Sequence, residues 1–324
     1  MKLVIRLFAG SALLLGLCSF AALAQSVISA KSGLVHYVEG RVLLADQPVE
    51  SHLGTFPDIK ENAQLRTEEG RAEVLLTPGV VLRVGESSAI RLITNRLIDT
   101  RVEFLSGSAL VEAAELPKDN GVTIVYNDRA VRLLKKGLYR FDSEPAQLRV
   151  YDGEAQVETG GKITAVNEGR MMAFSGEMAV TKFDTKDGDA LYRWAKRRAE
   201  YFAVANVSAA RSVRDAGSSF ASNGWVFNPY YSMFTYVPTN GMFYSPFGYA
   251  FWSPFTVYQA YYYGPSVFSR NGSTVPVTST IPGQPAKGTT TGASAGAPRS
   301  GGLSSASSAS SSVARSAGAV RGGR

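Results

Sequence analysis

Between residues 33 and 182 the chain consists of short apolar runs broken by turn-forming pairs, and this pattern constrains the fold most. The runs are rich in β-branched residues, and 71–77 and 148–157 alternate apolar and polar side chains. Such alternation indicates half-buried strands. Gly-containing pairs such as Asp152-Gly153 mark reversals, because glycine tolerates the positive φ of tight turns. The segment predicts an all-β domain of about ten to a dozen short strands.

The periodicity changes after this segment. Residues 187–215 contain no Gly or Pro beyond position 188, and their apolar side chains fall near one helical face. The pattern predicts one long amphipathic helix, with Asp187 or Asp189 as its N-cap. The basic run Lys196–Arg198 has two interpretations: a patch for an anionic partner, or a solvated helix face of the ordinary kind.

Residues 216–269 carry no charge and are dense in aromatic residues. Eighteen of the 44 residues from Phe220 to Tyr263 are aromatic, and an aromatic residue stands two positions before a proline five times. Each proline removes a backbone donor and restricts the residue before it, so the spacing disfavours helix. We expect an extended segment with turns at Asn240-Gly241 and Phe247-Gly248. The five copies end at Pro229, Pro238, Pro246, Pro254 and Pro265.

This aromatic segment contains the candidate binding residues. Its rings can pack into the core, form a stacking platform for a glycan or protein partner, or meet a membrane surface. In an extended chain, residues an even number apart share a face, and the copies recur at steps of about eight. The sequence therefore predicts that at least some of Trp225, Tyr236, Tyr244 and Trp252 are accessible and carry the partner contact.

The N-terminus resembles a secretory signal peptide. Residues 1–24 combine the basic Lys2 and Arg6, an apolar stretch shorter than the ~20 residues of a membrane span, and an Ala-x-Ala site. We expect export, with Gln25 as the first mature residue and a periplasmic or envelope-associated location. Lipidation at Cys18 is an alternative, disfavoured by the bulky leucine before it.

The segment 270–324 differs again in composition. It is dominated by Ser, Gly and Ala, and between 271 and 324 it holds five basic residues and no acid. With almost no large apolar side chain to bury, it is expected to be disordered. The positive balance of the mature chain lies here, so this basic tail is a candidate contact for an anionic surface.

Motifs for chemistry are scarce in the sequence. The chain has two histidines and one cysteine, and no nucleophile elbow, zinc-protease motif or phosphate loop. His36 and His52 fit packing or surface roles better than catalysis. The acidic group at 184–189 fits a helix cap better than a calcium loop, and Glu112 and Glu115 are expected among ordinary surface charges. We expect a non-enzymatic protein without cofactor, metal or nucleic-acid partner.

The β segment contains a series of strand-and-turn motifs: Val38-x-Gly40-x-Val42, Thr67 with Gly70, Pro78-Gly79, Leu105-x-Gly107, and Val150, Gly153 and Val157. With these motifs the segment as a unit resembles a FecR domain. The resemblance implies an extracytoplasmic all-β module, like a β-solenoid or roll and without catalytic residues. It spans about 33–175, and the chain is similar to secreted members in which a helix and an aromatic, Pro-rich segment follow.

Three functions remain open at this point. The first is a non-enzymatic envelope protein that binds or scaffolds an unidentified envelope partner through the β domain and the aromatic segment. The second is a carbohydrate-binding protein, because exposed Trp and Tyr rings can stack on sugars. The third is an adaptor in extracytoplasmic signalling, which rests on analogy to the family alone.

Overall fold

The computed structural model describes residues 32–50, 54–116, 121–176, 178–186, 188–217, 224–263, 266–268 and 274–276. The chain divides into two units, Met1–Thr278 and Ser279–Arg324, and every described residue belongs to the first. The expected signal peptide and Cys18 lie outside the described residues. The predicted tail also lies outside them, apart from Thr274–Pro276, which forms strand β21 against β20.

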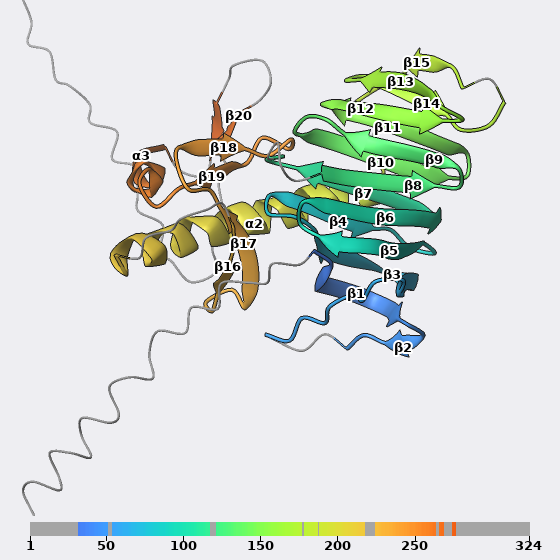
Figure 1. The fold of residues 1–324 in the computed structure, drawn as a ribbon. Helices are drawn as coiled ribbons and strands as arrows, with labels where there is room; N and C mark the ends of the chain where they lie inside the picture. The colour runs from blue at the N-terminus through green and yellow to red at the C-terminus, as the bar shows by residue number, and fades with distance from the viewer. Residues whose placement is uncertain are drawn as a thin grey trace, which may run out of the picture. The chain divides into compact units, whose positions relative to one another are not determined.

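In the described part of the range from Leu34 to Lys182, fifteen strands form one sheet, more than the sequence predicted. Figure 1 shows them as a ladder with β1 at one end and β15 at the other. The bounds are β1 Leu34–Leu44, β2 Gln47–Pro48, β3 Gln64–Leu75, β4 Val80–Val84, β5 Ala89–Arg96, β6 Asp99–Ser106, β7 Ser108–Ala113, β8 Gly121–Tyr126, β9 Arg129–Leu133, β10 Gly137–Ser143, β11 Ala146–Asp152, β12 Glu154–Thr159, β13 Lys162–Asn167, β14 Arg170–Ala173 and β15 Val180–Lys182.

The sheet is barrel-like and nearly closed. Its strand order is β13-β12-β9-β8-β6-β5-β3-β4-β7-β10-β11-β14-β15, with β1 and β2 beside β3. Only the β6–β8 pair is parallel among the described pairings. Strand β13, at one end of this order, also contacts β11 and β14 near the other end. The mostly-β class is confirmed, whereas a solenoid is not seen in the described part of the chain.

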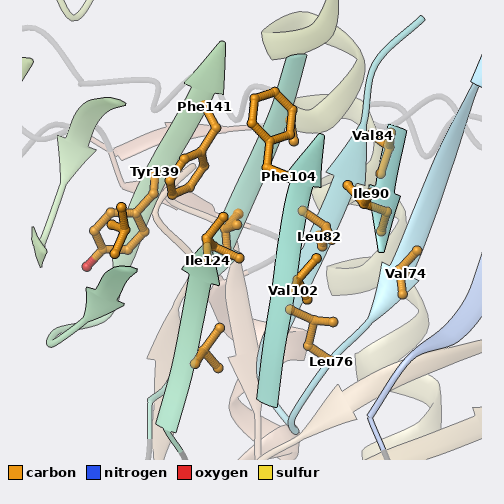
Figure 2. Close-up of a cluster of buried hydrophobic side chains, with 14 of the residues drawn as sticks. Val74, Leu76, Leu82, Val84, Ile90, Val102, Phe104, Ile124, Tyr139 and Phe141 are labelled. Carbon is orange, nitrogen blue, oxygen red and sulfur yellow. The ribbon is translucent and has the colours of Figure 1, made fainter. Parts of the chain in front are cut away.

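One apolar core fills the inside of this sheet. Side chains from strands β1 to β14 contribute to it, including Val74, Leu82, Phe104, Ile124 and Phe141, each at most 2% exposed. Figure 2 shows these residues pointing into a shared interior from neighbouring strands. The period-two alternation of the sequence corresponds to this inward face.

The central strands are also buried on their outer face. Every residue of β4 is buried, and so are all but the last of β10. The outward-facing Leu75, Val81, Leu110 and Leu138 pack against a layer formed by a helix and aromatic hairpins. Strands that are covered on both sides need apolar or paired side chains at every position, which explains their near-continuous apolar runs.

Helix α2 spans Ala190–Asp215, within the segment predicted to be helical. Asp189 is its N-cap, as one of the two predicted candidates, and its carboxylate accepts from the backbone N–H of Tyr192 at 2.9 Å. The face that carries Leu191, Trp194 and Phe202 is buried against the sheet and hairpins. No helix of the described residues is long and apolar enough to cross a membrane.

The aromatic segment folds as hairpins beside α2 (Figure 1). The expected turns form, since Gly241 and Gly248 both have positive φ. A short helix near the end of the segment departs from the expectation that the proline spacing excludes helix. It starts beyond Pro254 and meets no further proline until position 265. The elements are β16 Gly224–Asn228, β17 Met233–Val237, β18 Met242–Tyr244, β19 Ala250–Trp252, η2 Val257–Gln259, α3 Ala260–Tyr263, β20 Ser266–Phe268 and β21 Thr274–Pro276.

Two glycines permit the close approach of β1 and β3. Gly40 lies opposite Gly70 in the register, next to an irregularity before Val42. Gly40 has φ +69°, and a Cβ atom there would stand 2.1 Å from the carbonyl oxygen of Glu69. The position therefore excludes every side chain, both by its backbone conformation and by the space available.

Replacing Gly40 by Ala tests this constraint, with Gly169→Ala as the control. Gly169 has φ +70°, but nothing lies within 4 Å of a Cβ atom there. We expect Gly169→Ala to lower the free energy of unfolding by about 1–2 kcal/mol through backbone strain alone. Gly40→Ala should lower it by at least about 3 kcal/mol, because overpacking adds to the strain. Equal losses in urea unfolding would contradict the close approach.

Candidate functional site

A buried ionic cluster joins the outer face of the sheet to α2. The carboxylate of Glu73 on β3 accepts hydrogen bonds from Nε of Arg83 at 2.9 Å and from Nη2 of Arg198 at 2.8 Å. It also lies 3.0 Å from Nδ1 of His36 on β1. The side chains of Glu73, Arg83 and His36 are completely buried. Three strands and the helix therefore meet at a single carboxylate.

The cluster extends across β4 to β7. Arg83 also donates from Nη1 to the carboxylate of Glu112. Burial alone would raise the pKa of Glu73, but the guanidinium groups of Arg198 and Arg83 hold that pKa well below its usual range. Glu112 has one such neighbour, and burial raises its pKa. Glu112 was expected on the surface; the structure buries it, because α2 and the hairpins cover this face.

His36 also fixes the position of the first hairpin. Its Nε2 accepts the backbone N–H of Phe234 on β17 at 2.9 Å. The rings of Phe56, Phe202 and Phe234 surround the imidazole. His36 thus connects β1, β3 and β17, which agrees with the packing role expected of a lone histidine in a strand.

Polar side chains of α2 hold both hairpins. The buried Asn206 donates to the carbonyl oxygens of Tyr236 and Trp252 at 2.9 and 3.0 Å, and it accepts from the N–H of Trp252. Thr235 Oγ1 donates to the carbonyl of Phe202 at 2.7 Å. The sequence analysis missed Asn206, although an asparagine inside an alanine-rich helix, on its apolar face, is a signal that a buried polar contact is needed.

The structure buries three of the four candidate rings. Trp225, Tyr236 and Trp252 are 6%, 1% and 3% exposed, and Tyr244 is half-buried. Trp225 and Tyr236 pack edge to face between the sheet and α2, whereas Trp252 packs with the C-terminal half of α2. Three of the four are buried because they close the outer face of the sheet and the helix. Whether any of the four contacts a partner stays a prediction.

Other rings of the same segment are exposed. Phe255, Tyr258 and Tyr261 are 68%, 51% and 67% exposed, and they follow one another at steps of three through a turn, η2 and the start of α3. Side chains three residues apart lie on one side of such a helical turn. Val257 and Ala260, between them, are buried against α2. We call these three exposed residues the ring row.

One side chain of α2 contacts the ring row. The Arg211 guanidinium of α2 lies over the Tyr261 ring, 3.6 Å from its centroid. Tyr230 and Tyr231, at the turn between β16 and β17, form a second exposed pair, and Tyr230 is 92% exposed. The sequence pattern did not separate these rings from the buried ones, because it does not show which side faces α2.

Those of the remaining candidates that the structure describes have ordinary structural partners. Among the described residues, no group of three or more His, Cys, Asp or Glu side chains is placed to hold a metal ion. Asp184 accepts from the backbone N–H of Lys186, and Asp189 pairs with Arg140 at 2.7 Å. His52 and Asp187 lie outside the described part of the chain.

Comparison with known proteins does not assign a family. No family model and no curated protein matches the chain. Two crystal structures of a "putative anti-sigma factor" from Parabacteroides distasonis match part of it, with 14% and 15% identity and TM-scores of 0.34 and 0.33. The matches cover 38% and 37% of this chain and 61% and 59% of theirs, so the chain spans about 60% of their length.

Arg83→Met tests the energetic weight of the cluster, and Arg101→Met is the control. Arg83 is the buried partner of two carboxylates, whereas Arg101 pairs with Asp99 in a half-exposed position. Removing the buried partner should lower the free energy of unfolding by about 3–5 kcal/mol. The control should lose less than about 1 kcal/mol. Denaturant unfolding measures both values, and similar small losses would show that the cluster is not needed for stability.

Proposed function

We propose that this chain is a non-enzymatic, exported binding module of the cell envelope. Its contact surface is the ring row of Phe255, Tyr258 and Tyr261, and the FecR-like β domain is the scaffold. The observation that carries the proposal is the exposure of these three rings together within a segment that bears no charge. Exposed aromatic groups at such density typically mark an interaction site.

The residues that hold the ring row against α2 favour a role in binding over rings that are exposed without any function. Val257 and Ala260 anchor the row to α2, and Arg211 restrains the Tyr261 ring from one side. Rigid aromatic side chains offer a large contact area at a low cost in conformational entropy. The row therefore has the composition and the restraint of a recognition surface for another protein.

A glycan is the second candidate partner. The Tyr261 ring has Arg211 over one face, a restrained arrangement that also suits stacking on a sugar. The two candidates differ in what they need from the rings. A protein partner fills the space around all three, whereas a sugar stacks mainly on one or two ring faces.

The test is the triple variant Phe255→Ser, Tyr258→Ser and Tyr261→Ser in the full chain. We expect at least about tenfold weaker retention on envelope extract, because exposed aromatic anchors contribute most of the energy of such contacts. The melting temperature should stay near that of the wild type, since these rings are largely solvated. Tyr201→Ser is the matched control, because Tyr201 is an exposed ring on α2, outside the aromatic segment.

Two further arms separate the partner classes. Loss of binding after protease treatment of the extract indicates a protein partner, whereas binding to insoluble glycan alone indicates the carbohydrate alternative. Unchanged retention of the triple variant in both arms contradicts the proposal.

A further inference from the structure

Both ring nitrogens of His36 are engaged, and their partners fix its protonation. A backbone N–H can only donate, so Nε2, which accepts from Phe234, carries no proton. The proton of the neutral ring therefore lies on Nδ1, which donates to Glu73 at 3.0 Å. A second proton on Nε2 would place its N–H opposite the N–H of Phe234. Two donors cannot form a hydrogen bond, so the contact between β1 and β17 would break.

The charged groups around His36 come from three elements. Glu73 faces it from β3, Arg83 from β4 and Arg198 from α2. Glu112 on β7 lies beyond Arg83 and pairs with it. The other neighbours are the rings of Phe56, Phe202 and Phe234, and the imidazole has no access to water. If His36 gains a proton, its positive charge therefore lies near the guanidinium groups of Arg83 and Arg198. The carboxylate of Glu73, which could offset that charge, is already paired with both of them.

We propose that His36 is a pH-sensitive latch that holds the β16–β17 hairpin against the sheet at neutral pH and releases it in acid. The inference rests on the proposed function, because this hairpin belongs to the same aromatic segment as the ring row. Release exposes Trp225 and Tyr236, two of the four candidate partner-binding rings of the sequence analysis, which the closed state buries. Acid thereby enlarges the binding surface.

The sign of the effect follows from the environment of the ring. Burial lowers the pKa of His36 from 6.5, and Arg198 and Arg83 lower it further, against the opposing effect of Glu73. The folded state thus prefers the neutral ring. The stability gained from it is present above pH 6.5 and is lost as the pH falls from 6.5 toward the folded pKa.

The carboxylates titrate outside this window or in the opposite direction. Because the pKa of Glu73 is lowered in the folded state, the stability that Glu73 contributes is lost only when the pH falls below the ordinary pKa of 4.5. The raised pKa of Glu112 works the other way, since protonating that group favours the folded state. A loss between pH 6.5 and 5 that is absent from His36→Gln therefore belongs to His36.

Hydrogen exchange of the intact chain tests the latch. We expect the protection factors of amides in β16 and β17, corrected for intrinsic exchange rates, to fall by up to about 25-fold between pH 7 and pH 5. Amides of β10, inside the sheet, should stay more strongly protected than the hairpin amides at both pH values, because hairpin release leaves the sheet intact. Equal protection of the two sets at pH 5 would mean that the hairpin opens only by global unfolding, and no fall in the hairpin would mean that His36 is only a packing residue; either result overturns the proposal.

His36→Gln is the diagnostic variant, because its amide can donate and accept but does not titrate. Its hairpin protection should be independent of pH over the same window. If this variant does not fold, His52→Gln leaves His36 as the only histidine, and its imidazole resonance can be followed directly. If the His36 resonance titrates near pH 6.5 while the hairpin amides stay protected from exchange, the latch proposal is overturned. The exchange needs no partner, so it stands or fails independently of the ring-row variants.

Discussion

The carboxylate of Glu73, held between Arg83 from the sheet and Arg198 from the helix, is the interaction on which the rest of the structure depends. A buried charge is costly unless its partners are complete. The sheet supplies one guanidinium to Glu73 and the helix supplies the other. The outer face of the sheet is therefore complete only when α2 is docked, and α2 in turn holds the aromatic hairpins through Asn206.

This dependence explains how the rings of the aromatic segment divide. Rings that face the sheet and helix, such as Trp225 and Tyr236, close the second layer and exclude water from the ionic cluster. Rings on the opposite side, as in the ring row, remain exposed. The residues between them, Val257 and Ala260, pack with the buried Trp252 against α2. The same uncharged composition thus serves packing on one side and the proposed recognition on the other.

Local patterns were sufficient to predict the mostly-β class, the long helix and its Asp189 cap, because each depends on side-chain period or on turn chemistry nearby. The buried outer face was not predictable in this way. Glu73, Arg83 and Glu112 have the alternation of solvent-facing residues, and only the docking of α2 and the aromatic hairpins, which come much later in the chain, buries them. For the same reason the sequence could not separate buried from accessible rings among Trp225, Tyr236, Tyr244 and Trp252, since nothing local shows which side of a hairpin meets the helix.

The most direct test of this account is whether the two layers unfold as one. All three tryptophans, Trp194, Trp225 and Trp252, lie in the helix and hairpins, so their fluorescence reports that layer alone. The amide I infrared absorption of β-strands reports mainly the sheet, because most of the described strands belong to it. The account predicts coincident transitions by both probes in the wild type, and an earlier fluorescence transition in Arg198→Met. Two separated transitions in the wild type would contradict it.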